Sequence, residues 1–348
     1  MNQDARRKVL ITGGAGFIGV NLAARHIADG DAVTVFDNLS RRGADENLAW
    51  LNAHHTEDFR FVEGDICDAD GIRRAMSGIK VVYHMAAQTA VTTSVTDPRS
   101  DFEINAAGTF NVLEAARLEG DDAALLYAST NKVYGGMDHV GVIEYPSRYS
   151  YRDLPQGADE STPLDFHSPY GCSKGAADQY VRDYHRMYGL KTVVFRQSCI
   201  YGPRQMGVED QGWVAWFVIA AVLGKPLSIY GDGKQVRDLL YIDDLVRAYQ
   251  LAVENIHTTA GEIYNMGGGA PNTISVWAEF QPILSRVLGR PVAEPRFGDW
   301  RPGDQKVYFC DTSKAFRDFD WVPEIGVEEG ISRLAEWVQT NRGLFEAV

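Results

Sequence analysis

The stretch Lys8-Val-Leu-Ile-Thr12, followed by Gly13-Gly-Ala-Gly16-Phe-Ile-Gly19, decides the fold of this chain. Its first five residues are mostly apolar or β-branched, which is typical of a strand. Gly13, Gly16 and Gly19 then recur at every third residue, a variant of the dinucleotide-binding fingerprint. In such a turn the tight bend, the approach of a pyrophosphate and the packing of helix on strand each exclude a Cβ. Because a helix that starts here presents unpaired N–H groups to phosphates, the pattern predicts a strand, a turn and a helix that bind a dinucleotide.

Further short apolar runs follow, and helix-period segments lie between them. The runs are residues 32–36, 59–62, 81–85, 123–128 and 192–195. They are nearly all apolar rather than alternating, as expected of strands that are buried on both faces. Residues 105–118 have helical periodicity, with Phe110, Leu113 and Ala116 on one side. The alternation predicts an α/β fold with a Rossmann-type, doubly wound parallel sheet.

The regular alternation stops after about Tyr201, where glycine, proline and aromatic residues become frequent. We expect residues 1–200 to form the dinucleotide-binding domain, with short returns from the C-terminal half. We expect residues 201–348 to form mainly a smaller, irregular substrate-binding domain. A chain of 348 residues is long enough to bury full cores in two such domains.

The composition excludes several classes of protein. The chain has 34 basic and 47 acidic side chains, a formal net charge of −13, which argues against a general binder of nucleic acid or membrane surfaces. A local cationic pocket for one phosphorylated ligand is still compatible with this charge. The four cysteines form no CxxC pair and have no histidine cluster beside them, so we expect no metal site and reduced thiols in a cytoplasmic protein. The polar N-terminus and the lack of an apolar window of about 18 residues predict neither a signal peptide nor a membrane-spanning helix.

Two carboxylates bear on the identity of the dinucleotide. Asp37 ends the second predicted strand, where an acid can bind the ribose hydroxyls of the adenosine. A carboxylate there repels a 2′-phosphate and favours NAD over NADP, although Arg41 and Arg42 could offset the repulsion. Asp65 follows the third strand and is expected to meet the adenine edge, with Ile66 packing beside it. The alternative for Asp65 is a cap on the next helix.

The second chemical signal is a tyrosine and a lysine one helical turn apart. Ser168-Pro-Tyr170-Gly-Cys-Ser-Lys174 begins a predicted helix, with Ser168 as its cap and proline at the first helical position. Tyr170 and Lys174 share a face because they stand at i and i+4. A phenol is a poor base at neutral pH, but a neighbouring ammonium and an oxidised nicotinamide favour the phenolate. The pair is therefore suited to remove a hydroxyl proton while the carbon gives up a hydride.

Three features together resemble the extended short-chain dehydrogenase/reductase family, the nucleotide-sugar epimerases and dehydratases. They are the glycine turn, the Tyr170/Lys174 pair and Ser129-Thr130-Asn-Lys-Val-Tyr-Gly135. The likeness covers nearly the whole chain. It implies that Thr130 hydrogen-bonds the reacting sugar hydroxyl. Judged from the residues alone, Thr130 could instead form only a hydrogen-bonded turn at a strand end.

Longer strings narrow the resemblance to one group in that family, the CDP-paratose 2-epimerases, also called CDP-tyvelose epimerases. The strings are residues 37–44, 129–135, 165–180 and 210–213. The likeness implies an isomerase that inverts C2 of a CDP-linked sugar and retains its NAD. It also implies assembly as a homodimer or homotetramer through helices that flank the active site.

The same resemblance implies three sets of site residues. The cofactor-binding set is Gly13, Gly16, Phe17, Ile18, Gly19, Asp37, Asn38, Ser40, Arg41, Asp65, Ile66, Ala86, Gln88, Tyr170 and Lys174. The catalytic set is Thr130, Tyr170 and Lys174. The substrate-binding set is Thr130, Arg204, Arg237 and Arg301, of which Arg237 and Arg301 match the family's two diphosphate-binding arginines.

The residues after Thr130 bear on the reaction. The dehydratases of the family have Asp-Glu here, whereas this chain has Asn131 and Lys132, which cannot supply the acid and base that elimination needs. Reversible oxidation remains. Tyr170 would take the C2 hydroxyl proton as C2 gives hydride to NAD, and the keto sugar would turn over before the hydride returns. A UDP-sugar 4-epimerase and a net nucleotide-sugar dehydrogenase would use the same residues and stay open as alternatives.

Overall fold

Seven parallel strands form the central sheet of the computed structural model, which describes residues 6–55, 59–120, 122–300 and 304–346. Their order across the sheet is β13-β8-β5-β4-β1-β2-β3. The bounds are β1 Lys8–Thr12, β2 Ala32–Asp37, β3 Phe59–Glu63, β4 Val81–His84, β5 Ala124–Thr130, β8 Lys191–Gln197 and β13 Ile263–Met266. The chain runs outward from β1 in both directions, so the predicted Rossmann-type, doubly wound sheet is confirmed.

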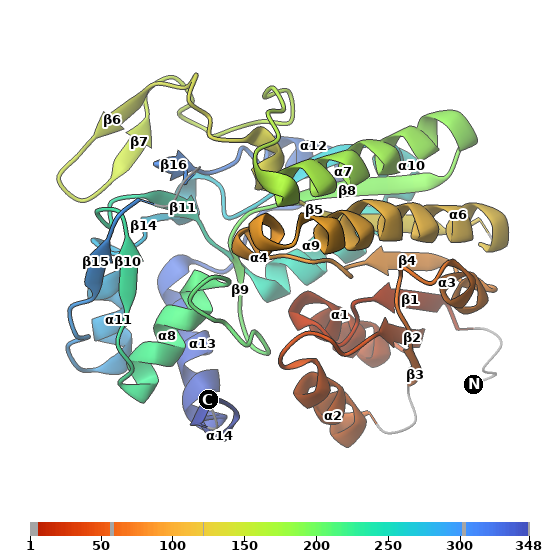
Figure 1. Cartoon of the computed structure of the whole chain (residues 1–348), viewed down its shortest axis with the longest axis horizontal. Coiled ribbons are helices and arrows are strands. Elements are labelled where there is room, and N and C mark those ends of the chain that lie inside the picture. The colour runs from red at the N-terminus through yellow and green to blue at the C-terminus, as the bar shows by residue number, and fades with distance from the viewer. Residues whose placement is uncertain (1–5, 56–58, 121, 301–303, 347–348) are drawn as a thin grey trace.

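Helices cover both faces of this sheet (Figure 1). One face carries α1 (Phe17–Ala28), α2 (Ala44–His54), α9 (Ile242–Glu254) and α12 (Ser313–Phe319), and the other carries α3 (Ala69–Met76), α6 (Thr109–Glu119) and α7 (Ser168–Tyr188). In β1, Val9 and Ile11 belong to the first core, whereas Leu10 belongs to the second. Successive side chains of a strand point to opposite faces, which explains why a strand buried on both faces reads as a continuous apolar run.

The connection from β4 to β5 is irregular before it becomes a regular helix. It contains α4 (Val91–Thr96), α5 (Pro98–Phe102), the π-helical turn η2 (Glu103–Gly108) and then α6. Leu113 and Ala116 are buried, but Phe110, expected on the same side, is 43% exposed. At 3.6 residues per turn the three positions spread over roughly 120° of the helix, so Phe110 lies at the edge of the apolar stripe. The sequence did not predict the π-helical turn.

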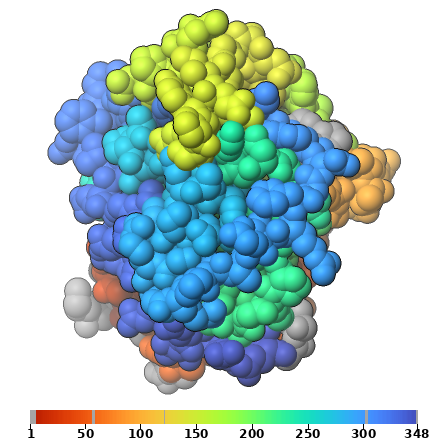
Figure 2. Space-filling view, turned by 90° about the vertical axis from the view of Figure 1, so that its left-hand side faces the viewer, coloured from red at the N-terminus to blue at the C-terminus, as the bar shows by residue number. Residues whose placement is uncertain are grey.

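Much of the C-terminal half gathers at one end of the sheet (Figure 1), and Figure 2 shows the face that it forms. The helices there are α8 Trp213–Leu223, α11 Phe280–Leu288, α13 Val327–Thr340 and α14 Gly343–Glu346, with η4 Ala270–Asn272, whereas α10 Ile256–Thr259 packs against β8 of the central sheet and against α9. The small sheets of this half pair β9 (Ile200–Tyr201) with β12 (Leu240–Tyr241), β10 (Ser228–Tyr230) with β15 (Arg296–Gly298), and β11 (Val236–Asp238) with β14 (Thr273–Ser275) and β16 (Val307–Tyr308). The hairpin of β6 (Val142–Glu144) and β7 (Tyr149–Tyr151) precedes residue 200 but bonds to this half, through Tyr149 N–H to Lys234 O at 3.0 Å.

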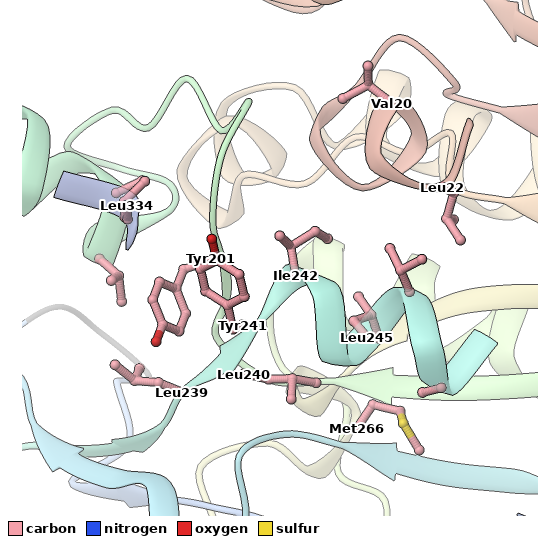
Figure 3. Close-up of a cluster of buried hydrophobic side chains, with 14 of the residues drawn as sticks. Val20, Leu22, Tyr201, Leu239, Leu240, Tyr241, Ile242, Leu245, Met266 and Leu334 are labelled. Carbon is pink, nitrogen blue, oxygen red and sulfur yellow. The ribbon is translucent and has the colours of Figure 1, made fainter. Parts of the chain in front are cut away.

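A buried apolar cluster joins the two halves (Figure 3). The rings of Tyr201 and Tyr241 meet edge to face at 5.5 Å. Ile242 and Leu245 begin α9, which returns from the C-terminal half and packs against α1. Residues from both halves of the chain therefore share one continuous buried core.

A buried ion pair fixes α7 against the sheet. Arg196 of β8 and Asp178 of α7 are at most 2% exposed, and their side chains form two hydrogen bonds of 2.9 and 3.0 Å. Ser129 of β5 donates to the same carboxylate at 2.7 Å. The pair therefore sets the position of α7 beside the end of β5. Among the described residues, no helix is long and apolar enough to span a bilayer.

We expect Arg196→Met to lower the free energy of unfolding by about 3–5 kcal/mol, because it leaves Asp178 charged and uncompensated in the interior. Urea unfolding followed by circular dichroism measures this loss. The double variant Arg196→Met/Asp178→Asn is the control and should recover most of it. A loss below about 1 kcal/mol in the single variant would contradict a stabilising role for the pair.

Candidate active site

The glycine turn lies between the carboxyl end of β1 and α1. Gly13 has a φ of +66°, and an added Cβ would lie 2.6 Å from the backbone nitrogen of Ala86. At Gly16 the nearest atom to an added Cβ is the Gly13 carbonyl oxygen at 3.1 Å, and the space around it is otherwise open. α1 begins without a side-chain cap and without an acidic residue in its first turn. No side chain competes for the first N–H groups of α1, so this cradle fits the pyrophosphate of a dinucleotide.

The predicted adenosine-binding residues lie together at the neighbouring strand ends. Asp37 Oδ2 accepts from Ala15 N–H at 3.0 Å, which holds the carboxylate against the glycine turn. Asn38 Nδ2 donates to Asp65 Oδ2 at 2.9 Å, and Ser40 donates to Asn38 Oδ1 at 2.7 Å. These groups can hydrogen-bond ribose hydroxyls and an adenine edge.

The alternative for Asp65 as the cap of the next helix is wrong. The residue that caps α3 is Asp68, which accepts from Asp70 N–H at 3.2 Å. Asp65 instead accepts from Cys67 N–H at 2.8 Å, within a short turn after β3. Ile66 is buried and lies against Gly108 at the start of α6.

Ala86 and Gln88 stand in the loop after β4, which lies on the other side of β1 from β2 and β3. Gln88 and Asn105 of η2 exchange two hydrogen bonds, Gln88 N–H to Asn105 Oδ1 at 3.0 Å and Asn105 Nδ2 to Gln88 O at 3.1 Å. The predicted cofactor-binding residues therefore line the carboxyl ends of the strands from β3 to β4, where open parallel sheets bind their ligands.

Thr130, Tyr170 and Lys174 meet beyond β5. The sequence predicts Ser168 as the cap of α7, but Ser168 is the first helical residue and His167 takes the cap position. Ser168 Oγ still accepts from Gly171 N–H, three residues along, at 3.2 Å. Lys174 Nζ donates to Ala128 O at 2.6 Å and lies 4.2 Å from the centre of the Tyr127 ring. Thr130 Oγ1 accepts from Lys132 N–H at 3.2 Å, as a strand-end turn would have it, and its hydroxyl lowers the pKa of the neighbouring Tyr170 phenol. The strand-end turn is therefore present, and the role of Thr130 toward a sugar hydroxyl stays a prediction.

The electrostatics of this cluster differ from the simple picture of a lysine beside a phenol. Burial lowers the pKa of Lys174 to about 7, although Asp178 and Asp101 both oppose the shift. Burial raises the pKa of Tyr170 to about 12, opposed by the hydrogen bond with Thr130 and by the Arg41 cation. The cation that acts on the phenol here is thus Arg41. At neutral pH Tyr170 holds its proton, and formation of the phenolate needs further positive charge in the site.

Arg41 belongs to the cofactor-binding set that the resemblance implies, and this role stays a prediction. Its side chain extends from the loop after β2 toward Tyr170, and Nη1 donates to Thr89 Oγ1 at 2.6 Å. Gln211, which precedes α8, donates to the same hydroxyl. Arg41, Thr89 and Gln211 therefore connect the loops after β2 and β4 to the C-terminal half. Sequence spacing carried no signal for this contact.

The predicted substrate arginines do not share one environment. Arg237 is 7% exposed, and its Nη2 donates to Asp304 Oδ1 at 2.7 Å. It lies within electrostatic range of Lys132, which places both cations on the same side of the site. Arg204 instead stacks over Trp50 of α2 at 4.0 Å, so its role toward substrate stays a prediction. Arg301 lies outside the described residues.

Comparison with known proteins shows the family to which this chain belongs. The sequence profile of the NAD dependent epimerase/dehydratase family matches residues 9–267. The chain belongs to this family. It is 43% identical to the CDP-paratose 2-epimerase of Salmonella typhi over 96% of this chain and 99% of that protein.

Two solved structures of family members are also similar. The dTDP-glucose 4,6-dehydratase DesIV of Streptomyces venezuelae, with NAD and TYD bound, has a TM-score of 0.83 and 33% identity, covering 98% of this chain and 99% of that one. The UDP-glucose 4-epimerase of Thermotoga maritima, with UDP-glucose, has a TM-score of 0.81 and 31% identity, covering 96% and 99%. NAD is accordingly the cofactor of this epimerase/dehydratase family member, as its glycine cradle and Asp37 predict.

We expect Gly16→Val to weaken NAD binding about tenfold or more, because its side chain fills the open space beside the first N–H groups of α1. Its φ of −70° suits any residue, so the free energy of unfolding should change by less than about 1 kcal/mol. Isothermal titration with NAD and urea unfolding measure the two effects. Gly13→Ala is the contrast, since a side chain at positive φ against Ala86 should also destabilise the fold. Unchanged NAD affinity in Gly16→Val would refute the assignment of the cradle.

Proposed function

We propose that this enzyme is a CDP-paratose 2-epimerase, an isomerase that exchanges CDP-paratose and CDP-tyvelose by inverting C2 of the sugar. The likeness to the Salmonella enzyme along almost the full length of both chains carries the proposal. The cluster of Thr130, Tyr170 and Lys174 beside a dinucleotide cradle supports it, because this set can oxidise and reduce a secondary alcohol. We also propose that the enzyme acts in the cytoplasm. Its four free cysteines support this, because the cytoplasm keeps thiols reduced.

In the proposed reaction one phenol serves both directions. When bound, NAD supplies a hydride acceptor for the first half and a hydride donor for the second. Tyr170 takes the proton of the C2 hydroxyl, Thr130 holds that hydroxyl, and a 2-keto sugar results. After the ketone has turned over, Tyr170 returns the proton to the new hydroxyl. The two half-reactions cancel, so no net oxidation occurs.

The turn after β5 supports epimerisation over dehydration. Asn131 and Lys132 stand in η3 (Asn131–Tyr134), directly after Thr130. Burial and the nearby Arg237 lower the pKa of Lys132, whereas Asp304 opposes this shift. Lys132, Arg237 and Asp304 thus lie together after β5, a set that suits a diphosphate, and Asn131 and Lys132 replace the Asp-Glu with which the dehydratases expel a hydroxyl. Arg237 could bind the diphosphate through two parallel hydrogen bonds.

The likeness to a UDP-glucose 4-epimerase supports a second candidate function, that of a UDP-sugar 4-epimerase. A net nucleotide-sugar dehydrogenase is a third, since it would need the same three catalytic residues. The three differ in what they consume and which carbon changes. An epimerase keeps its cofactor and alters one stereocentre, whereas a dehydrogenase consumes free NAD in proportion to product.

Incubation with CDP-, UDP- and dTDP-linked sugars in deuterium oxide tests the proposal, with NMR of the products. We expect a CDP-linked sugar to invert at C2 and to retain its own hydrogen there, because hydride returns within the site. Free NAD should produce no sustained rise in absorbance at the reduced-nicotinamide band. Tyr170→Phe is the control and should bind NAD but lose turnover by roughly a hundredfold or more.

Three outcomes would overturn the assignment. Solvent deuterium at C2 would indicate deprotonation of the carbon instead of hydride return. Inversion at C4 of a UDP-linked sugar alone would favour the 4-epimerase. Full turnover by Tyr170→Phe would remove the phenol from the reaction.

Assembly of the enzyme as a homodimer or homotetramer is a further part of the proposal. Exposed apolar and aromatic side chains gather on α6 and α7, and the second copy of the chain is the partner they fit. They are Phe110, Leu118, Tyr180, Met187 and Tyr188. Phe110 and Tyr180 also contact each other, with ring centres 6.1 Å apart. A patch of this kind is costly to leave in water and is typical of an interface.

We expect Tyr180→Glu/Met187→Glu to shift the enzyme from an oligomer to a monomer, because the charges would be buried at the interface. Light scattering after size-exclusion chromatography gives the mass directly. Val322→Glu is the matched control, an exposed apolar residue away from these helices, and should leave the mass unchanged. A monomeric wild-type enzyme would contradict the proposal.

A further inference from the structure

A buried carboxylate beside α7 forms no ion pair with any of the described residues. Asp101 of α5 has no exposed surface. Its Oδ2 accepts from Ser173 Oγ at 2.5 Å and its Oδ1 accepts from Asn105 Nδ2 at 3.1 Å. Both donors are neutral, and across the described ranges no lysine, arginine or histidine forms an ion pair with it. A carboxylate in such a place costs stability, so a compensating interaction is expected.

The hydrogen bonds of Asp101 connect the cofactor edge to the catalytic helix. Asn105, which donates to Asp101, exchanges two hydrogen bonds with the backbone of Gln88 in the loop after β4. Ser173, the other donor, stands between Tyr170 and Lys174 on α7. α5 and η2 both pack against α7. One carboxylate thus touches the segments that carry both the cofactor residues and the base.

Lys174 follows Ser173 on α7, and the charge of Asp101 acts on the lysine ammonium through space, without an ion pair between the two side chains. Asp178 and Asp101 both raise the pKa of Lys174 against the effect of burial. Arg196 already pairs with Asp178, whereas Asp101 has no such partner. The other charged or titratable groups around Lys174 are His84 of β4, Tyr127 of β5 and Tyr170 of α7. Burial, with Lys174 adding to it, lowers the pKa of His84 to about 3, so His84 is neutral. The Tyr127 phenol is neutral because burial raises its pKa.

We propose that Asp101 is a positioning residue of the active site, whose negative charge stabilises the Lys174 ammonium and whose hydrogen bond to Ser173 orients the first turns of α7. It does not touch the substrate in this role. Its effect passes through Lys174 and Tyr170. The charges of Asp101 and Lys174 interact through space across the α5–α7 contact.

The direction of the pH effect follows from the charges. A carboxylate raises the pKa of an ammonium and of a phenol alike, and Asp101 acts on both Lys174 and Tyr170 in this direction. Its removal therefore lowers both pKa values. The Lys174 ammonium is then lost at lower pH, and the phenolate forms at lower pH. Both limbs of the pH–rate profile move toward acid, whereas a purely structural defect lowers the rate at every pH without moving either limb.

NMR of the enzyme labelled at lysine Cε, with its cofactor bound, measures the titration of Lys174 directly; Lys174→Met assigns the signal. We expect Asp101→Asn to lower the pKa of Lys174 by about one unit. The pH–rate profile should shift toward acid by a similar amount. Asp97→Asn is the matched control, an exposed carboxylate at the start of the same helix, and should move neither quantity.

The exchange variant Asp101→Ser/Ser173→Asp guards against a folding failure of Asp101→Asn. It moves the carboxylate across the same hydrogen bond and keeps it near Lys174, so it should retain a Lys174 pKa near that of the wild type. An unmoved Lys174 titration in Asp101→Asn would overturn the inference. So would a Lys174 pKa lowered by about one unit in the exchange variant. The inference rests on the proposed function only for the rate profile. The NMR titration needs no substrate. An unmoved Lys174 titration would therefore overturn the role of Asp101 and leave the epimerase assignment standing, and loss of the epimerase assignment would leave the titration result standing.

Discussion

A hydrogen bond of 2.6 Å joins the Lys174 ammonium to the Ala128 carbonyl, and it ties α7 to β5 two residues before Thr130. An ammonium in the interior is stable only if its charge is compensated. The Tyr127 ring, Asp178 and Asp101 supply that compensation from three elements. The position of Tyr170 beside Thr130 depends on this arrangement, because both tyrosine and lysine project from the first turns of one helix.

Asp178, which compensates the charge of Lys174, is itself held by further polar groups in the sheet. Asp178 could not remain buried without Arg196, and Arg196 in turn donates to the hydroxyl of Tyr134 at 3.0 Å. The active site is thus one edge of a polar network that runs into the sheet. Such a network is rigid when every member is satisfied, which suits a site that must hold one phenol against one hydroxyl. Burial explains why the Tyr170 phenol is protonated at rest, since Arg41 and the Thr130 hydroxyl lower its pKa by less than burial raises it.

The second half of the chain completes the site without dividing the protein into independent bodies. α9 leaves the small β9–β12 pair and packs on α1, and β13 then joins the central sheet as its seventh strand. The apolar cluster in Figure 3 fills the junction. Arg237, from the C-terminal half, is thereby brought within electrostatic range of Lys132, which follows the catalytic strand.

The sequence alone determined the sheet, the glycine turn and the helix that carries Tyr170 and Lys174, because each depends on contacts within a few residues or on a strict apolar pattern. Spacing also predicted that Asp37, Asp65 and Thr130 lie at or just after the carboxyl ends of their strands, which meet at one edge of a parallel sheet. Only the tertiary structure decided that Arg41 reaches Thr89, that Arg204 stacks on Trp50 and that the charge of Asp101 acts on Lys174. These contacts join residues far apart in the chain, and a charged side chain has no periodicity that reveals its partner. Burial decided the pKa values of the site. Lys174 has a pKa of about 7 and Tyr170 one of about 12, because both are buried by neighbours that no local sequence pattern shows.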